Sequence, residues 1–321
     1  MKKEIGGYLE LESYKRGYSY YNYSDFNSAR NAFLFYLINK RITKIFLPYF
    51  LCDSITNVCK RHNISYSYYH IDDCMRPILN MVNIRDDELV YIVNYFGFLT
   101  NAEIICLKKL YRNILVDNVQ CFYRKAVKNV PTIYSCRKYF GVPDGAYLSY
   151  FIKESFSLKK SSARDRMTHL IGRKEGLASD YYQKFIENEL FLNNAPIEKM
   201  SMESDEILNN IDHSFVIKRR NQNFKILHKS LKSINLLEIR LNKGPFCYPL
   251  YVKNGKELRG YLIKNLIYVP KLWPNVIYKK NWSFEADLSD NLVPIPCDQR
   301  YSKKDMERIC RTVLKYEKKQ S

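Results

Sequence analysis

Residues 88–117 read ELVYIVNYFGFLTNAEIICLKKLYRNILVD, and this stretch decides the fold. An apolar run ends in the turn NYFG, a helical pattern follows from Ala102 to Arg112, and a second apolar run ends at Asp117. Short apolar runs on either side of a helical pattern are typical of buried parallel strands joined by a crossover helix. The stretch therefore predicts a strand–helix–strand unit of a parallel sheet.

The same alternation continues on both sides of this unit. Upstream, residues 44–50 (KIFLPYF) and 64–71 (ISYSYYHI) are predicted strands that flank a predicted helix over residues 53–62. Downstream, residues 132–135 (TIYS) and 146–152 (AYLSYFI) are predicted strands. This order predicts an α/β domain with a mainly parallel sheet, in which ligands bind at the carboxyl ends of the strands.

The second half of the chain has a different pattern, with long polar helical stretches such as residues 204–231 and a few short apolar segments. The last helix is predicted to open at Ser302, with Asp305 three residues later at the spacing of a capping box. Four apolar residues then repeat at helical spacing and predict a core-facing stripe: Met306, Ile309, Cys310 and Val313.

Length and composition indicate a folded protein with more than one domain. The chain has 321 residues with 46% hydrophobic residues, which is enough for a sizeable core and argues against disorder. We predict a larger domain with an N-terminal segment over residues 1–205 and a smaller α+β domain over residues 206–321.

Several classes of protein are excluded by what the sequence lacks. No apolar run approaches the roughly 20 residues of a membrane span, and the N-terminal stretch has no apolar signal core. We therefore expect a cytoplasmic protein with no membrane span. The nine cysteines and five histidines are scattered, so neither a disulfide framework nor a metal site is predicted. The motifs GxSxG, HExxH and GxxxxGK[ST] do not occur.

The formal net charge of +19 indicates an anionic partner, which can be a nucleic acid, an anionic lipid surface or a phosphorylated small molecule. The 28 tyrosines would allow stacking on single-stranded nucleic acid. However, the excess of Lys, Asn, Ile and Tyr runs evenly along the chain, as expected of a general compositional bias rather than of a binding face. We therefore predict no nucleic-acid partner.

Three polar positions stand at predicted strand ends or helix starts: Ser28 in NSARNAF, Asp117 in VDNVQ and Lys138 in YSCRKYFGVPDGAYL. Taken one by one, they can be a helix cap, a turn residue and a solvated surface amine. Taken together, they supply a phosphate cradle, a carboxylate that keeps a pyridine nitrogen protonated and an amine that can form an imine. These are the requirements of pyridoxal 5′-phosphate chemistry.

With these residues in place, the chain resembles the DegT/DnrJ/EryC1/StrS family of pyridoxal-phosphate-dependent sugar aminotransferases, and in particular its shorter members found with polysaccharide genes. The resemblance runs nearly end to end. It includes GGYLELE, NSARNAF, LPYFLCDS, VNYFG, VDNVQ, YSCRKYFGVPDGAYL, KRRNQNF and IPCDQRYSKKDM, in the family's order. It implies the pyridoxal-phosphate transferase fold of type I, with a mainly parallel large domain.

The resemblance also implies roles at the centre of the site. Lys138 would bind the cofactor covalently through its aldehyde, Asp117 would pair with the pyridine nitrogen, and Gln120 would lie against the cofactor ring. The charge of Arg137 would favour the neutral, nucleophilic form of the lysine. Alternatively, Arg137 turns to solvent or to phosphates of the substrate.

At the phosphate, the resemblance implies contacts from Ser135 and from the turn Ser28–Ala29–Arg30, where a helix N-terminus favours an anion. Asn223, or Asn221, would reach the phosphate bound by a partner subunit, because sites in this family are completed across a homodimer.

The sequence also departs from the family. Ala29 stands where members often carry Gly, and Cys52 stands where an aromatic residue usually stacks on the cofactor. Tyr49, Phe50 or Tyr95 would then take the stacking role.

The implied activity is the transfer of an amino group, with glutamate as donor, to a keto sugar carried on a nucleotide, in the synthesis of a polysaccharide such as O-antigen or capsule. Two alternatives remain open at this point. One is a pyridoxal-phosphate enzyme of another reaction type, such as a sugar dehydratase or an enzyme with a non-sugar substrate. The other is a non-enzymatic scaffold of the same fold, or a basic nucleic-acid-binding protein.

Overall fold

The computed structural model describes residues 5–9, 23–79, 84–150, 158–278 and 283–320. The chain forms two compact units. The larger unit comprises Tyr8–Pro48 and Asp53–Asp212, and the smaller unit comprises Met1–Gly7, Tyr49–Cys52 and His213–Ser321.

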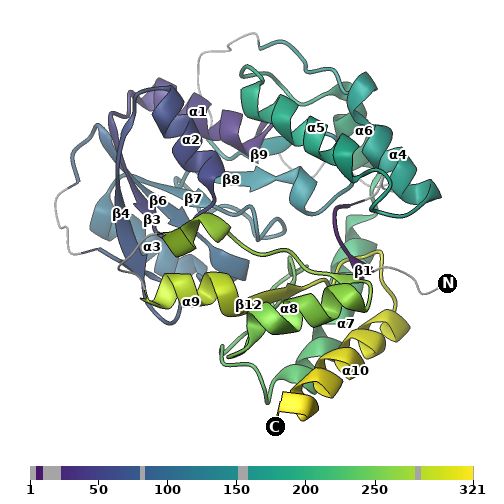
Figure 1. Ribbon diagram of the computed structural model, residues 1–321. Helices are drawn as coiled ribbons and strands as arrows, with labels where there is room; N and C mark the ends of the chain where they lie inside the picture. Colours follow the sequence, from purple (N-terminus) through teal and green to yellow (C-terminus); the bar gives the residue numbers. More distant parts are fainter. Residues whose placement is uncertain (1–4, 10–22, 80–83, 151–157, 279–282, 321) are drawn as a thin grey trace. The chain divides into compact units, whose positions relative to one another are not determined.

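An eight-stranded sheet forms the centre of the larger unit, in the order β2-β9-β8-β7-β6-β3-β4-β5 (Figure 1). Its strands are β2 (Ser24–Phe26), β3 (Lys44–Pro48), β4 (Ser65–Ile71), β5 (Pro77–Ile78), β6 (Glu88–Val93), β7 (Ile114–Asp117), β8 (Thr132–Ser135) and β9 (Ala146–Leu148). The five strands from β8 to β4 pair in parallel, whereas β9 is antiparallel to both β8 and β2, and β5 is antiparallel to β4. The predicted α/β fold with a mainly parallel sheet is confirmed.

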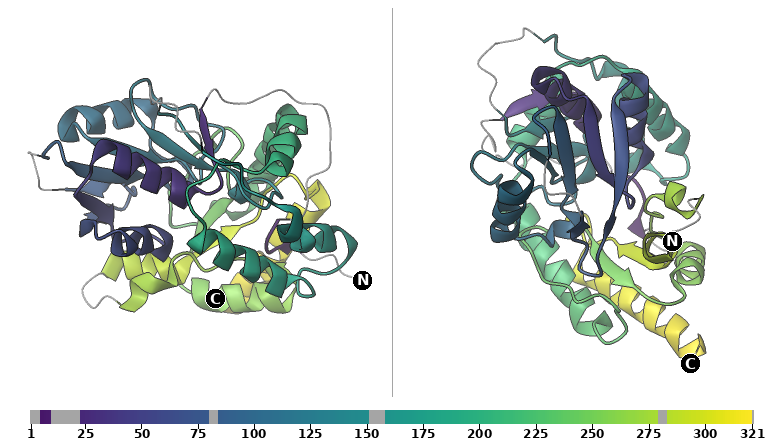
Figure 2. Two further views of the ribbon diagram at one scale, coloured as in Figure 1. Left: turned by 90° about the horizontal axis from the view of Figure 1, so that it is seen from above. Right: turned by 90° about the vertical axis from the view of Figure 1, so that its left-hand side faces the viewer.

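Three helices accompany the sheet: α1 (Ala29–Lys40), α2 (Asp53–Arg61) and α3 (Asn101–Tyr111). The chain moves from β3 through α2 to β4 in one direction along the sheet, and from β6 through α3 to β7 in the other. Because such crossovers are right-handed, α2 and α3 cover opposite faces of the sheet (Figure 2). Every residue of β6 is buried, as expected of a strand covered on both faces.

The rest of the larger unit is helical, with α4 (Thr168–Glu175), α5 (Tyr182–Asn194), α6 (Met202–Asn210) and three short 3₁₀ helices, η1 (Tyr95–Gly97), η2 (Cys136–Lys138) and η3 (Arg164–Arg166). A buried ion pair ties this part to the turn that follows η2. Arg166 Nη2 donates to Asp144 Oδ2 at 2.7 Å, and Asn188 of α5 donates to the backbone oxygen of Pro143 at 2.8 Å. These contacts hold α5 close to η2.

The smaller unit has an α+β composition. Its strands are β1 (Ile5–Gly6), β10 (Tyr248–Tyr251), β11 (Ile267–Tyr268) and β12 (Leu292–Ile295), and its helices are α7 (His213–Leu231), α8 (Gly255–Lys264), η4 (Pro274–Tyr278), α9 (Ser283–Asn291) and α10 (Lys303–Gln320). β1 pairs with β11 in parallel and β10 with β12 antiparallel. Helices α7 and α10 pack against one another, as Figure 1 shows in green and yellow.

The expected opening of α10 is present in the structure. The Ser302 N–H donates to Asp305 Oδ2 at 2.8 Å, and the Ser302 hydroxyl donates to the same oxygen at 2.9 Å. The predicted apolar stripe of this helix is buried at all four positions: Met306, Ile309, Cys310 and Val313. The short-range spacing in the sequence therefore predicted both features correctly.

Two predicted boundaries differ from the structure. The helical stretch over residues 204–231 is broken, because Ile211 adopts an extended backbone with ψ 132° between α6 and α7. The two units divide at this break, at residues 212 and 213, whereas the predicted domain boundary at 205 and 206 falls inside α6. The strand predicted over residues 146–152 ends at Leu148, and its last two positions lie outside the described residues.

In the described part of the chain, no helix combines the length and the apolar character that crossing a membrane requires.

Candidate active site

The carboxyl ends of β7 and β8 carry the central residues of the candidate site. Asp117 is the last residue of β7 and Ser135 the last of β8, and Lys138 ends the 3₁₀ turn η2 that follows directly. β7 and β8 are parallel neighbours, with Asp117 opposite Ile133. Asp117 and Lys138 therefore lie at the same edge of the sheet, where ligands bind in this class of fold.

The Asp117 carboxylate is partly buried and held by two hydrogen bonds. Oδ1 accepts from the backbone N–H of Val119 and Oδ2 from the hydroxyl of Tyr91, both at 2.7 Å. Burial raises the pKa of Asp117 above 3.8, while these two donors and the charge of Lys138 limit the rise. Since a carboxylate has about four acceptor positions, this group is fixed in place and can still accept a hydrogen bond from a ligand.

Lys138 is exposed, and its ammonium group forms no hydrogen bond or ion pair with the described residues. Its charge nevertheless acts on two carboxylates, because it opposes the rise in the pKa of Asp117 and helps to lower the pKa of Glu189. The amine therefore stands near both carboxylates without being bonded to either.

Gln120 stands three residues after Asp117 in the loop that follows β7, and it links the loops that follow β6 and β8. Its Oε1 accepts from the backbone N–H of Phe96 at 3.1 Å, and its backbone oxygen accepts from the hydroxyl of Tyr139 at 3.0 Å. Phe96 has a positive φ of 52°, so this hydrogen bond supports an uncommon backbone conformation beside the site. The contact of Gln120 with a cofactor stays a prediction.

The start of α1 lies at the same edge through the pairing of β8, β9 and β2. Ser135 stands opposite Ala146, and Ala146 stands opposite Phe26, two residues before Ser28. Ser28 is the N-cap of α1, as predicted, and its hydroxyl accepts from the backbone N–H of Asn31 at 3.2 Å.

The hydroxyl of Ser135 has no hydrogen-bond partner among the described residues, so it can bond to a ligand. Ala29 and Arg30 form the first turn of α1, where backbone N–H groups favour an anion. The contacts of Ser28, Ala29, Arg30 and Ser135 with a phosphate stay predictions.

Arg137 does not turn to solvent. Its Nη2 pairs with Oε1 of Glu189 on α5, and its side chain is 14% exposed. The other oxygen of Glu189 lies 3.5 Å from Nη2 of Arg30. Although burial favours the neutral acid, the charges of Arg137, Lys138 and Arg30 lower the pKa of Glu189 to about 2. Glu189 is therefore ionised, and its carboxylate pairs with the guanidinium groups of both Arg137 and Arg30.

In the turn after Lys138, Gly145 needs the conformational freedom of glycine. Its φ is 115°, and an added Cβ would lie 3.2 Å from the Cβ of Cys136. Gly141 does not adopt a positive φ. The backbone oxygen of Gly145 accepts from the N–H of Cys136, which fixes the start of η2.

Asn223 belongs to the smaller unit, where its side-chain nitrogen donates to three backbone oxygens between Cys297 and Tyr301, at 3.0 to 3.3 Å. Its side chain therefore holds the segment before α10, and this arrangement does not favour the predicted contact with a partner's phosphate. Asn221 is half-buried, and its Oδ1 accepts from the N–H of Gly244 at 2.9 Å.

Among the three aromatic candidates for stacking, Tyr95 alone belongs to the unit that contains Lys138. It follows β6, the strand next to β7, and its ring is 2% exposed. Tyr49 and Phe50 belong to the smaller unit, where Phe50 packs edge-on against Trp273. Which residue stacks on the cofactor stays a prediction.

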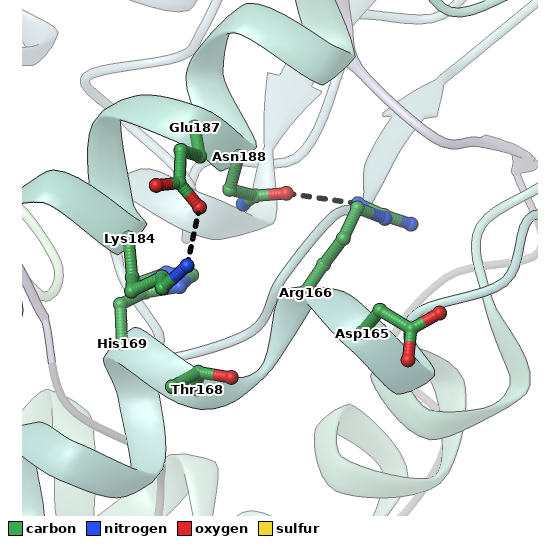
Figure 3. Close-up of a pocket in the computed structure, with 7 residues that line it drawn as sticks. All are labelled: Asp165, Arg166, Thr168, His169, Lys184, Glu187 and Asn188. Atoms are coloured by element: carbon green, nitrogen blue, oxygen red, sulfur yellow. Dashed lines mark hydrogen bonds and ion pairs between the residues drawn. The ribbon is translucent and has the colours of Figure 1, made fainter.

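A small pocket lies between α4 and α5 (Figure 3). Two interactions join residues of its lining: Lys184 with Glu187 within α5, and Arg166 with Asn188. Its lining consists of Asp165, Arg166, Thr168, His169, Lys184, Glu187 and Asn188. None of the predicted site residues is among them.

Two residues of the site were missed by sequence reasoning, Tyr91 and Glu189. Tyr91 had a weak signal, because it places a hydroxyl in the middle of the apolar run ELVYIV. Glu189 had none, because it is one of several acidic residues on a polar helix.

Asp72, Asp73 and Cys74 bring ligand atoms within 4.8 Å of one another in a turn. A metal is not assigned there, since acidic groups in such turns are common without one.

Comparison by sequence finds no matching family model and no matching curated protein. Comparison of structures finds clear matches. PseC of Helicobacter pylori, an aminotransferase involved in the biosynthesis of pseudoaminic acid, is 13% identical, with a TM-score of 0.62 over 91% of this chain and 85% of the other.

Two further structures match to a similar degree. A DegT DnrJ EryC1 StrS aminotransferase from Brucella abortus is 13% identical, with a TM-score of 0.59 over 91% of this chain and 85% of that one. The putative sugar aminotransferase Spr1654 from Streptococcus pneumoniae, in its PLP form, is 10% identical, with a TM-score of 0.59 over 90% of this chain and 85% of that one. The chain therefore has the fold of the DegT/DnrJ/EryC1/StrS sugar aminotransferases.

Proposed function

We propose that this protein is a pyridoxal-phosphate-dependent aminotransferase that acts on a keto sugar. The observation that carries the proposal is the position of Lys138 and Asp117 at the ends of neighbouring strands, with the amine unpaired and the carboxylate held by two hydrogen bonds. The fold shared with sugar aminotransferases supports the same assignment.

The described side chains fit pyridoxal phosphate. Lys138 offers an amine without a bonded partner, and Asp117 offers further acceptor positions for a protonated ring nitrogen. Ser135 and the first turn of α1 offer donors for the phosphate. The cationic excess around Arg30 and Arg137 suits the nearly two negative charges of a phosphate ester.

When bound, pyridoxal phosphate supplies the electron sink that amino transfer requires. In this site, Asp117 would hold the ring nitrogen of the cofactor in its protonated form. Lys138 Nζ would anchor the cofactor and, once released, would serve as the base and acid for the proton that amino transfer moves. Tyr91 keeps the carboxylate of Asp117 oriented for its task.

For the finer assignment, we propose a nucleotide-linked keto sugar as substrate and glutamate as amino donor, in a pathway that builds a polysaccharide. The formal net charge of +19 supports an anionic substrate such as a sugar nucleotide. The role of PseC in the biosynthesis of pseudoaminic acid offers a parallel for a sugar substrate.

We also propose that the protein is a homodimer in the cytoplasm. Helices α4 to α6 and the segments beside them expose several large apolar side chains, each between 44% and 56% exposed: Ile171, Leu177, Tyr182, Leu190, Phe191 and Met202. A second copy of the chain would cover part of this surface. Sedimentation velocity tests the proposal, with Leu190→Glu expected to shift the protein toward monomer and the exposed Lys184→Glu to leave its assembly unchanged.

The decisive experiment is reductive trapping. The purified chain is incubated with pyridoxal phosphate, reduced with borohydride, digested and analysed by mass spectrometry. We expect the pyridoxyl adduct on Lys138 and not on the exposed Lys125 in the preceding loop. Labelling spread over many lysines, with Lys138 no more modified than Lys125, would count against an active site at this position.

The substrate is tested next, by incubating the loaded protein with glutamate and a panel of nucleotide-linked keto sugars. A product that has gained an amino group supports the proposal. Loss of water from the sugar without amino transfer would indicate a dehydratase. Absence of the adduct together with salt-sensitive retention of oligonucleotides would indicate a nucleic-acid-binding protein built on this fold.

A further inference from the structure

The net charge of the protein is concentrated in the smaller unit. Residues 213–321, the main part of that unit, contain 23 Lys and Arg against 9 Asp and Glu, whereas residues 1–212 contain 29 against 24. Most of the formal net charge of +19 therefore belongs to the shorter part of the chain. A compositional bias that ran evenly along the sequence would not produce this difference.

Exposed cations line the outer face of α10. This α10 row consists of Lys304, Arg311, Lys315 and Lys318. At 3.6 residues per turn, these positions fall within about 60° of one another around the helix axis and extend over about 21 Å. The row lies opposite the buried stripe of the same helix, so it faces away from the core. None of its side chains forms an ion pair or a hydrogen bond with another described residue.

Helix α7 repeats the pattern at the same spacing. This α7 row consists of Lys218, Lys225, Lys229 and Lys232, all of them exposed. Lys232 follows the helix directly, and its backbone N–H still bonds to the oxygen of His228, so the helical spacing continues to this residue. Helices α7 and α10 pack against one another (Figure 1). Both rows therefore belong to the outer surface of one unit.

Stability alone does not explain the two rows. Like charges three or four residues apart on a helix repel one another and destabilise it. Lys225 and Lys229 stand in this relation on α7, which contains no acidic residue. On α10 the exposed acidic residue is Glu307, which pairs with Lys303 beside the row at 3.6 Å. A helix face that only needs to be solvated usually mixes both signs, so the rows indicate an anionic partner outside the chain.

The form of this surface favours an extended polyanion over a small phosphorylated ligand. The outward face of a helix is convex, so a single phosphate bonded there stays in water and gains little. Four cations spread over about 21 Å can instead act together on many anions.

Among extended polyanions, the residue types favour an anionic lipid bilayer. Surfaces for single-stranded nucleic acid carry successive aromatic side chains on which bases stack, whereas Phe215 is the one exposed aromatic residue of α7 and α10. Arginine prevails where phosphates are recognised specifically, but seven of the eight cations in the rows are lysines. Clusters of about four to eight cations on an amphipathic helix are typical of binding to anionic lipids.

We propose that the outer face of the smaller unit, formed by the α10 row and the α7 row, binds the surface of an anionic lipid bilayer. The cations act on the lipid headgroups, while the apolar faces of both helices remain in the core of the unit. Binding is therefore peripheral, reversible and sensitive to salt. The proposal goes beyond the proposed reaction and does not depend on it.

The test is cosedimentation of the full chain with vesicles over a range of lipid concentrations. Vesicles of phosphatidylcholine alone are compared with vesicles in which about a third of the lipid is anionic phosphatidylglycerol. Two variants each replace all four cations of one row by glutamine. The control variant removes the same charge from four exposed positions of the larger unit: Lys60→Gln, Lys109→Gln, Lys128→Gln and Lys174→Gln.

Wild type should bind the anionic vesicles and not the neutral ones, and high salt should release it, because salt screens exposed charges from one another. Each row variant should need at least about tenfold more lipid for half-maximal binding, since each cation near an anionic bilayer strengthens binding several-fold. The control variant should change much less. Urea unfolding should show that both row variants are at least as stable as the wild type, because they remove like-charge repulsion.

Two results with vesicles would overturn the inference: a wild type that does not bind the anionic vesicles, and a control variant that is weakened as much as the row variants. Retention on oligonucleotides is measured at the same salt concentration. If oligonucleotides bind more tightly than vesicles per phosphate, and the row variants lose this binding, the inference also fails and the rows belong to a nucleic-acid surface.

Discussion

The hydroxyl of Tyr91 donates a 2.7 Å hydrogen bond to Oδ2 of Asp117, from the middle of one buried strand to the end of the next. Tyr91 is 1% exposed, and its backbone oxygen accepts a hydrogen bond from the hydroxyl of Tyr69 at 2.7 Å. A tyrosine inside β6 thus positions the carboxylate on which the proposed chemistry depends.

Replacing Tyr91 by Phe should weaken cofactor binding. The Tyr91→Phe variant leaves one carboxylate oxygen of Asp117 without its donor, and hydrogen bonds to charged groups contribute about 1.5–3 kcal/mol. We expect the dissociation constant of pyridoxal phosphate to rise at least about tenfold, measured by absorbance titration.

The matched control is Tyr69→Phe, which removes the hydroxyl that donates to the backbone oxygen of Tyr91. It should lower the free energy of unfolding by about 1 kcal/mol with little effect on cofactor affinity. Equal losses of affinity in both variants would assign Tyr91 a packing role instead.

Removing one partner of the buried ion pair between Asp144 and Arg166 should strongly destabilise the larger unit. Asp144 is fully buried, and besides Arg166 it accepts hydrogen bonds from the hydroxyls of Ser201 and Ser204. Asp144→Asn leaves the charge of Arg166 uncompensated, and removing one partner of a buried pair costs about 3–5 kcal/mol. Urea unfolding measures this loss.

The exposed pair of Lys184 and Glu187 provides the comparison for that variant. Glu187→Gln should cost less than about 1 kcal/mol, as exposed pairs usually do. A loss below about 1 kcal/mol for Asp144→Asn as well would mean that the network around Arg166 rearranges to replace the missing charge.

The parallel strands were predictable because the sequence marks them directly. β3, β4, β6, β7 and β8 each begin and end within about two residues of their predicted bounds. For β3, β6, β7 and β8 the reason is burial, since strands buried on both faces form short apolar runs. The break at Ile211 was not predictable. The polar helical pattern continues across it, and tertiary packing decides where a helix ends when local propensity does not.

The residues of the candidate site also fall into two groups, those that the sequence indicates and those that only the folded chain brings together. The placement of Asp117, Ser135 and Lys138 at one edge of the sheet was predictable, because they stand at or directly after the ends of predicted strands; their roles stay predictions. Glu189 lies 52 residues from its partner Arg137, on a helix whose acidic residues look alike in the sequence. Only the folded chain shows which of them meets the arginines.

Gly145 should be hard to replace. Its φ of 115° and the 3.2 Å gap to the Cβ of Cys136 mean that Gly145→Ala forces a strained backbone, at about 1–3 kcal/mol. Because its backbone oxygen also bonds to the start of η2, the displacement should reach Lys138. We expect lower stability in thermal unfolding and a lower yield of the adduct on Lys138.

Gly260 in the middle of α8 is the control, since an added Cβ there meets nothing within 4 Å. Gly260→Ala should raise the free energy of unfolding by up to about 1 kcal/mol. A neutral effect of Gly145→Ala would show that the turn after η2 relaxes without strain.

His169 should make the protein sensitive to mild acid. Burial, with smaller contributions from Arg137 and Arg166, lowers its pKa to about 4, against an opposing effect of Glu189. Below pH 6.5 the unfolded chain binds a proton at this residue, whereas the folded chain does not until about pH 4. The free energy of unfolding should therefore fall as the pH decreases through this window, by at most about 3 kcal/mol.

The measurement is urea unfolding at several pH values between 7 and 4, for the wild type, His169→Gln and His62→Gln. Glutamine does not titrate, so His169→Gln should lose less stability than the wild type on going from pH 7 to pH 4, even if it starts from a lower value. His62 is exposed and provides the control, whose pH dependence should match that of the wild type. Parallel curves for all three proteins would place the acid sensitivity in other residues.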